Sequence, residues 1–540
     1  MYLIVLMIAL NIVINGNQLG NEVVEFTSSN LPIVIINTTG DSIGVTNRSV
    51  AEMKIIWNGD NNRNIITDLP SNYNGRIEIE LHGQSSLEFP KKSFRIETQD
   101  SSGENLNISL LGLPKENDWI LYAPYSDKSL MRNAIVYTIA GKISEYAPRV
   151  KYCELILDGS YNGLYVLTEK IKLDKNRINI TRMLSDDINE PEVSGGYIFK
   201  KDKESEEDNV IMLKRGLQLI ITEPKKNKIV DEQKIWLEDY LNSFEDVLYS
   251  NGNYEDYIDV GSFVDHFLIV EFAKNIDGYR RSTYFHKDRG GKIVASSVWD
   301  YNLSFGNADF NYGWNSAGWY YPVISGWDKN WWVKLIEDDT FYNLCINRWK
   351  ELRLNQFNET KIISLIDDLL VLLLEAQERN FNRYPILSEY VSFNPGFPQS
   401  GSFGFNSPTT GGDMSWEEQI KYLKRFVLDR LQWIDSKFGV DIVGLQNNDH
   451  EGNTLFNIYQ NYPNPYNSTT SFNYSIEALS NVNLSVYDIN GRLVKTLVNE
   501  QKSAGDHSVT FYTSKLSSGT YIYKLKAGSF EMSRKMILLK

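Results

Sequence analysis

Two aspartates, Asp277 and Asp300, lie 23 positions apart and enclose a predicted β-hairpin. Asp277 follows a long apolar helical pattern, and Asp300 lies in a Trp-Asp-Tyr-Asn turn that ends a short apolar run. Between them, the strand-like segments 283–286 and 292–298 are joined by the turn signal Gly290-Gly291. Because a hairpin returns the chain, we expect the two acids to lie close together. One acid that accepts a proton and another that binds a metal ion are the minimum equipment for phosphoryl transfer.

The elements that must position these acids form a strand-rich half followed by a helix-rich half. Residues 28–222 are mostly alternating or β-branched, with one helical pattern at 129–143. Helical patterns dominate from residue 229 onward. This order predicts a two-lobed α+β fold with a β-rich N-lobe, an α-rich C-lobe and the acidic hairpin at their junction. The predicted strands are 32–37, 52–57, 76–82, 93–97, 152–158 and 163–169, and the predicted helices are 230–249, 260–273, 361–379 and 415–438. The last helix begins at Ser415-Trp-Glu-Glu418, which fits a capping box.

The two ends of the chain differ from this body. The apolar residues 1–19 are interpreted as a secretory signal peptide, with a buried first strand as the alternative. The body spans 25–440 and contains a Gly-, Pro- and Phe-rich segment at 393–413 that is predicted as a long loop. A polar linker at 441–454 then leads to residues 455–540. Short alternating runs split by Asn-Gly, Ala-Gly and Ser-Gly turns predict a small all-β sandwich there.

Composition excludes several function classes. With 42% hydrophobic and 13% aromatic residues, the 540-residue chain is globular and long enough for two or more domains. Its net charge of −14 disfavours nonspecific binding to nucleic acid or to an anionic membrane. The two cysteines, Cys153 and Cys345, are predicted as separate buried thiols, with a disulfide as the alternative. No later stretch is apolar enough for a transmembrane anchor.

A series of motifs along the body resembles the CotH kinase family, atypical kinases first known from bacterial spore coats. The resemblance covers residues 25–440 and implies the kinase-like fold, with ATP as the nucleotide, Mg²⁺ or Mn²⁺ as the metal and a protein as the acceptor. Its motifs include Leu81-His-Gly-Gln-Ser-Ser86, Phe89-Pro-Lys-Lys-Ser-Phe-Arg95, Ser126-Asp-Lys-Ser-Leu-Met-Arg-Asn133, Thr168-Glu-Lys-Ile171, Gly195-Gly-Tyr-Ile-Phe-Lys-Lys-Asp202 and the hairpin segment from Asn275 to Gly306.

The resemblance implies roles for both acids. Asp277 matches the catalytic aspartate that orients and deprotonates the acceptor hydroxyl; a turn cap after the helix is the alternative. Asp300 matches the metal-binding aspartate, and Asn302 stands where the family often has a second Asp. Oxygen ligands of this kind suit Mg²⁺. Ser282 is a departure, because family members frequently have Asn there, and a hydroxyl is a poorer metal ligand than an amide.

The same resemblance implies a set of nucleotide-binding residues: Lys91, Lys92, Arg95, Arg132 and Glu169. Strand alternation puts Lys91 and Arg95 on one side and Lys92 on the other, so only one set can face a cleft. A solvated basic strand edge is the alternative for all three. Glu169 is expected to pair either with a phosphate-binding lysine or, structurally, with Arg177.

The C-terminal segment is similar to the sorting domain of the type IX secretion system. The similarity rests on Asn461-Tyr-Pro-Asn-Pro465, on segments 486–492 and 516–524, and on a basic last strand at 535–540. It implies export through the periplasm to the medium or the cell surface, with the type IX machinery as a partner. An ordinary carbohydrate- or surface-binding sandwich is the alternative.

Three functions remain to be weighed. The two resemblances together imply a secreted atypical protein kinase that transfers phosphate from ATP to Ser or Thr of exported or surface proteins. The alternative is a catalytically weak, kinase-like surface-binding protein, for which the aromatic segments 311–321 and 327–332 would supply a ligand face. Packing of the helical lobe is the alternative, and commoner, role of such aromatic residues. A glycoside hydrolase that uses Asp277 and Asp300 as its acid pair is a third possibility.

Overall fold

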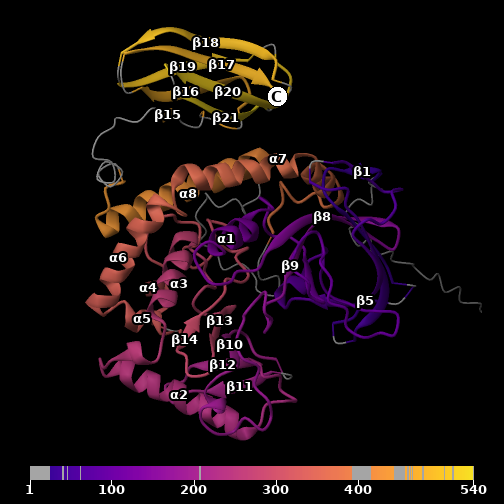
Figure 1. The fold of residues 1–540 in the computed structure, drawn as a ribbon, viewed down its shortest axis with the longest axis vertical. Coiled ribbons are helices and arrows are strands. Elements are labelled where there is room, and N and C mark those ends of the chain that lie inside the picture. The colour runs from indigo at the N-terminus through magenta and orange to yellow at the C-terminus, as the bar shows by residue number, and fades with distance from the viewer. Residues whose placement is uncertain are drawn as a thin grey trace, which may run out of the picture.

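The computed structural model describes residues 25–391, 415–442 and 457–538, apart from short gaps within these ranges. The predicted signal peptide at 1–19, the loop at 393–413 and the linker from residue 443 onward lie outside the described residues. Strands predominate in the first part of the described chain, helices in the middle, and two further sheets follow (Figure 1). This order confirms the α+β class.

The strand-rich part contains a closed barrel with the strand order β2-β3-β5-β6-β7-β9-β8. Neighbouring strands are antiparallel except β2 and β8, which pair in parallel from Ile33–Glu154 to Ile36–Leu157 and close the barrel. The inward-facing apolar residues pack around Trp119 and Tyr165, both fully buried. The strands are β2 (Ile33–Asn37), β3 (Ser49–Ile56), β5 (Tyr73–His82), β6 (Ser93–Thr98), β7 (Asp118–Tyr122), β8 (Val150–Leu157) and β9 (Ser160–Glu169), with a small separate pair β1 (Ser28–Ser29) and β4 (Asn64–Ile65).

A second sheet contains the predicted hairpin. Its strand order is β11-β12-β10-β13-β14, so the hairpin β13–β14 pairs with β10 from the strand-rich half. Gly195 precedes β10 and allows the close approach of the hairpin turn, because a Cβ atom there would lie 2.0 Å from the Asp288 carbonyl carbon. The strands are β10 (Tyr197–Lys201), β11 (Asn209–Met212), β12 (Gln218–Glu223), β13 (Thr283–Lys287) and β14 (Ile293–Ala295). The β-rich half is therefore divided into a barrel and a separate sheet, which the predicted single N-lobe did not anticipate.

All five predicted helices are present, and the described chain has three further helices between residues 321 and 354 that were not predicted. Helix α3 has the predicted bounds, and α8 begins with the predicted capping box between Ser415 and Glu418. Helix α1 begins later than predicted, because Leu130 has a left-handed φ of 67° that interrupts the helical path. The helices are α1 (Arg132–Ala140), α2 (Asp231–Tyr249), α3 (Val260–Ala273), α4 (Tyr321–Ile324), α5 (Trp332–Leu335), α6 (Asp339–Leu354), α7 (Glu359–Arg383) and α8 (Trp416–Phe438).

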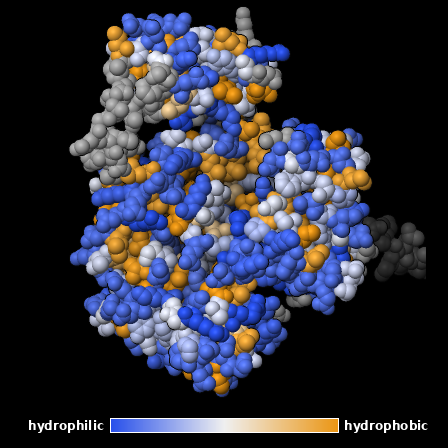
Figure 2. Space-filling view, in the orientation of Figure 1, coloured by the Kyte–Doolittle hydropathy of each residue, from blue (hydrophilic) through white to orange (hydrophobic). Residues whose placement is uncertain are grey.

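The C-terminal residues form the predicted sandwich, which lies against α7 and α8 (Figure 1). On the visible face, hydrophobic residues gather on the body just below the sandwich (Figure 2). At this junction Lys424 pairs with Asp367 and donates to the Asn464 carbonyl at 2.6 Å. The strands are β15 (Asn457–Ile458), β16 (Thr469–Ile476) and β19 (Gly505–Tyr512) in one sheet, and β17 (Ser480–Asp488), β18 (Leu493–Lys502), β20 (Gly519–Ala527) and β21 (Phe530–Leu538) in the other.

Two predictions about the whole chain can be checked on this fold. Cys153 and Cys345 are both buried and free, which confirms separate thiols. Among the described residues, no helix combines the length and apolar character that crossing a membrane requires.

Candidate active site

Asp277 lies in the turn between α3 and β13. Helix α3 ends at Ala273, and the next residue, Lys274, has a left-handed φ of 45°. Asp277 then donates its N–H to Asn275 Oδ1 at 3.2 Å, and its carbonyl accepts the N–H groups of Arg280 and Arg281. Arg280 Nε donates to Asp277 Oδ1 at 2.9 Å. One carboxylate oxygen is therefore oriented by Arg280, in a turn that is fixed by backbone hydrogen bonds.

Asp300 lies at the other end of the hairpin and is held through its backbone. Its φ is 58°, and its N–H donates to the Tyr137 hydroxyl of α1 at 3.0 Å. The next N–H, of Tyr301, donates to Asn133 Oδ1 at 2.7 Å. The Asp300 carboxylate accepts no hydrogen bond from the residues that the structure describes. Backbone contacts thus position a half-buried acid whose oxygens remain available.

The environment of Asp300 is unfavourable for its negative charge. Burial raises the pKa of the Asp300 carboxyl to about 7, and the charges of Asp277 and Asp202 act in the same direction. The charge of Asp277 therefore reaches Asp300 from the other end of the hairpin. Asp202, at the end of β10, joins them. Such a shift, from burial combined with specific charged neighbours, is typical of functional carboxylates.

Backbone strain is concentrated in the same segment. Of the ten non-glycine residues with positive φ in the described chain, six lie between residues 274 and 312. They include Ser282, with a φ of 51°, and Asp300. Left-handed backbone costs energy for residues other than glycine, asparagine and aspartate, and it clusters where a fold must aim particular side chains. The left-handed backbone at the two ends of the hairpin therefore indicates a functional constraint in addition to packing.

Asn302 and Arg132 support the turn that carries Asp300. The Asn302 amide donates to Ser126 Oγ at 3.5 Å, a long contact that leaves its carbonyl oxygen available. Arg132 is fully buried and donates to the carbonyls of Ser304 and Phe305 at 2.9 and 3.2 Å, and it also pairs with Asp127. The guanidinium of Arg132 thus contacts the backbone of the turn and Asp127, and its donors are used within the protein.

A cluster of cations lies on the barrel side of this region. Arg95 Nη2 and Lys172 Nζ contact Asp118 at 3.1 and 2.6 Å, and Lys170 Nζ lies 3.7 Å from it. Burial opposes ionisation of Asp118, but these three cations together lower its pKa. His82 joins the cluster, because burial followed by the charges of Lys170, Arg95 and Lys200 lowers its pKa to about 4. Arg95 also contacts Glu80 and Lys172 also contacts Glu116, each at 2.9 Å, so the cluster combines several cations with the carboxylates that pair with them.

Lys200 and Asp202 connect the basic cluster to the acids. Lys200 Nζ lies 2.8 Å from Asp202 Oδ2. The charges of Lys200, Asp202 and Asp300 all affect the pKa of the buried Tyr284 phenol, which burial raises. The basic and acidic groups therefore form one continuous polar region between the barrel and the second sheet. Sequence reasoning selected neither Asp202 nor Lys170, although both lie within the motifs that carry the family resemblance.

Three other predicted residues have different surroundings. Lys91 is buried between the barrel and α7, where its Nζ donates to Asn380 Oδ1 at 2.7 Å and to the Leu164 carbonyl. Burial lowers its pKa to about 7. Lys92 Nζ donates to the Leu87 carbonyl. Glu169 accepts from Arg149 Nε at 2.8 Å, so neither of its predicted partners is the one observed. Of the strand lysines and arginine, only Arg95 lies in the basic cluster.

The donor set is compatible with a weakly held divalent cation. No group of three or more His, Cys, Asp or Glu side chains in the described ranges is arranged to hold a metal ion. Mg²⁺, however, is commonly bound by one or two protein oxygens together with water and substrate phosphates. The Asp300 carboxylate and the side-chain carbonyl of Asn302 are oxygen ligands of this kind.

The aromatic segments that suggested a ligand face are largely internal. Trp319 packs against Trp433 and Phe438, with ring centroids 4.9 and 5.1 Å apart. Trp331 and Trp332 are fully buried. These three tryptophans therefore pack the helical region, which was the alternative interpretation of these segments.

Comparison with known families matches both parts of the chain. The model of the CotH kinase protein family matches residues 79–434. The chain belongs to the CotH kinase protein family. The family match spans the cation cluster, both hairpin acids and Asp202. A second model, the secretion system C-terminal sorting domain, matches residues 460–539 and indicates secretion or cell-surface localisation. No curated protein matches the chain.

Proposed function

We propose that this CotH family member is a secreted atypical protein kinase that transfers phosphate from ATP to Ser or Thr of exported or surface proteins. The observation that carries the proposal is the Asp300 carboxylate. It lies on a turn in which Asp300 has a left-handed φ of 58°, is near Asp277 and Asp202, and accepts no hydrogen bond from the described residues. An acid left without partners beside other acids is unfavourable unless a cation completes the site.

The residues divide the reaction between them. Asp277, oriented by Arg280, would accept the proton of the acceptor hydroxyl and align its oxygen for attack. Asp300 and Asn302 would hold Mg²⁺, which neutralises charge on the nucleotide phosphates. Arg95 and Lys170 would contact those phosphates from the barrel side. Phosphoryl transfer needs little more than this positioning and charge stabilisation.

Two substitutions separate nucleotide binding from chemistry. Asp300→Asn should abolish metal-dependent ATP binding, because the charged metal ligand is lost. Asp277→Asn should leave ATP binding nearly intact and slow phosphoryl transfer on the order of 10²–10⁴-fold, because only acid–base assistance is removed. Asp246→Asn, which alters an exposed acid paired with Arg215, is the matched control and should change neither property.

The measurement is ATP affinity with Mg²⁺ or Mn²⁺, together with labelling of the protein itself and of casein-like acceptors by labelled ATP. Equally poor ATP binding by wild type and Asp300→Asn with any divalent ion would refute the kinase proposal. The alternative, a catalytically weak surface-binding protein, would then replace it. Asn302 and Ser282, which stand where the family often has Asp and Asn, would explain the weak metal binding.

A further inference from the structure

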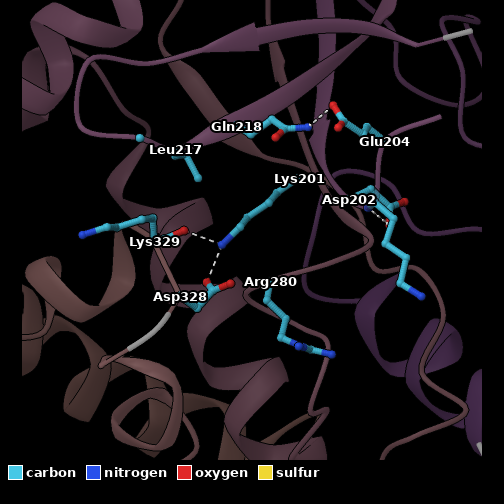
Figure 3. Close-up of a pocket in the computed structure, with 10 residues that line it drawn as sticks. Lys201, Asp202, Glu204, Leu217, Gln218, Arg280, Asp328 and Lys329 are labelled. Atoms are coloured by element: carbon cyan, nitrogen blue, oxygen red, sulfur yellow. Dashed lines mark hydrogen bonds and ion pairs between the residues drawn. The ribbon is translucent and has the colours of Figure 1, made fainter. Parts of the chain in front are cut away.

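An open groove of about 550 Å³ lies at one end of the second sheet (Figure 3). Strand β10 ends there at Lys201, and β12 begins there at Gln218. Strand β13 begins opposite Lys201, because Thr283 is its register partner. Arg280, which orients Asp277, also lines the groove. The sheet therefore places this groove directly beside the proposed catalytic acid.

The acids of the groove are already engaged by neighbouring side chains. Asp328 pairs with Lys201, which points between Asp328 and the Lys329 carbonyl (Figure 3). Glu204 accepts from Gln218 Nε2 at 2.6 Å. Asp202 pairs with Lys200, on the side of the basic cluster. Each carboxylate that lines the groove thus has a partner within the protein.

Besides Lys329, one cation of the groove and one that lies next to it are not engaged in this way. Lys203 lines the groove, and Arg281 follows Arg280 in the turn before β13. Neither forms an ion pair with any residue that the structure describes. Burial, followed by the charge of Arg281, lowers the pKa of Lys203, and burial followed by the charge of Arg280 lowers that of Arg281. Lys203, Arg280 and Arg281 therefore repel one another, and the charges of Asp277 and Asp202 partly offset this repulsion.

We propose that this groove binds the acceptor polypeptide through an acidic side chain next to the hydroxyl that Asp277 addresses, with Lys203 and Arg281 as the residues that recognise it. The inference rests on the proposed kinase function and specifies its substrate class as acidic Ser- or Thr-containing segments. A carboxylate from the acceptor would complete the pairing that the described residues leave open, and it would relieve the repulsion among the cations.

The position of the groove favours an acceptor over a nucleotide. The cations Arg95, Lys170 and Lys172 contact Asp118 of the barrel strand β7, whereas Lys203 lines the groove at the end of β10. Nucleotide phosphates at the barrel and an acceptor at the groove would approach Asp277 and Asp300 from opposite sides. An in-line transfer requires such an arrangement of donor and acceptor.

The test compares two fluorescent peptides that each have one serine, flanked by Glu in one and by Gln in the other. We expect the full chain to bind the Glu peptide about tenfold more tightly than the Gln peptide, by fluorescence anisotropy at low salt. The Lys203→Gln/Arg281→Gln double variant should bind both peptides equally. Lys329→Gln is the matched control, because it removes a charge from the same groove but its amine points away from Arg280 (Figure 3). It should keep the preference.

Kinetics and competition then separate the two proposals. With labelled ATP, the double variant should raise KM for the Glu peptide about tenfold and leave kcat unchanged. A Lys203- and Arg281-dependent preference in binding, with no phosphorylation of either peptide, would sustain the groove and refute the kinase. Equal binding of both peptides by the wild-type chain would overturn the groove proposal. So would displacement of the Glu peptide by metal-free ATP, which would assign the groove to nucleotide phosphates.

Discussion

Two buried charged regions of this protein are built in opposite ways. In the helical region, Arg430 of α8 is fully buried and donates to Glu271 Oε2 at 2.9 Å, to the Glu271 carbonyl and to the carbonyls of Ser316 and Gly318. Glu271 also accepts the N–H groups of Tyr320 and Tyr321. At the hairpin, Asp300 is held by its backbone while its carboxylate has no partner in the described chain.

This difference shows what each region contributes. A buried charge with a complete set of partners rigidifies the fold, because removal of one partner leaves the others unpaired. A charge that faces like charges and lacks partners costs stability, and it persists where a ligand uses it. The Glu271–Arg430 pair thus connects α3, α8 and the segment around Tyr320 into a rigid frame. The hairpin that carries Asp277 and Asp300 is attached to this frame.

The largest effect should come from the frame. We expect Arg430→Met to lower the free energy of unfolding by about 3–5 kcal/mol, because it leaves the Glu271 carboxylate buried and uncompensated. Arg425→Met on the same helix is the matched control: its pair with Asp429 is exposed, so it should cost less than about 1 kcal/mol. Urea unfolding measures both. Similar losses for the two variants would remove the distinction between the two regions.

A second comparison separates Lys91 from Arg95, which the sequence placed on one face. Lys91→Met should destabilise the protein by roughly 1–3 kcal/mol, since Asn380 and the Leu164 carbonyl lose their donor, and should leave ATP affinity unchanged. Arg95→Gln should weaken ATP binding with a smaller loss of stability. Calorimetric binding and urea unfolding test this division, and loss of ATP affinity in Lys91→Met would return Lys91 to the site.

The third prediction concerns pH and the hairpin acid. Because the pKa of Asp300 is raised to about 7 in the folded state, the folded protein binds more protons than the unfolded chain between about pH 4 and 7. The contribution of the Asp300 carboxyl to the free energy of unfolding therefore falls as pH rises through that window. Asp300→Asn should remove this dependence and gain about 1–2 kcal/mol at pH 8, because the group is only partly buried. Unfolding midpoints from pH 4 to 8 measure the difference; a variant less stable than wild type at pH 8 would contradict it.

The smallest effect should come from Ser282, which has a left-handed φ of 51°. Ser282→Asn should stabilise the turn by about 0.5 kcal/mol, because asparagine tolerates this backbone better than serine. It should also raise phosphoryl transfer if weak metal ligation limits this family member. Ser250→Asn, at an exposed position with a φ of −91° after α2, controls for the added amide. Thermal unfolding and labelling by ATP report the two effects separately.

Local patterns in the sequence were sufficient for many elements. The bounds of α3, the capping box of α8, the β13–β14 hairpin and the separate sandwich were all predicted, because helical periodicity, strand alternation and turn residues act over a few positions. The resemblance to the CotH family likewise depended on ordered local motifs. Asp277 and Asp300 were selected for the same reason, since the hairpin that brings them together is a local structure.

Tertiary structure alone decided how distant segments meet. Closure of the barrel depends on the parallel pairing of β2 with β8, more than 100 positions along the chain. The burial of Lys91 depends on Asn380 of α7, and the proximity of Asp202 to Asp300 depends on the pairing of β10 with β13. Alternation predicts which residues share a face of a strand, but what covers that face depends on packing of elements that are remote in sequence. For this reason the sequence identified the acids, and the fold determined which cations accompany them.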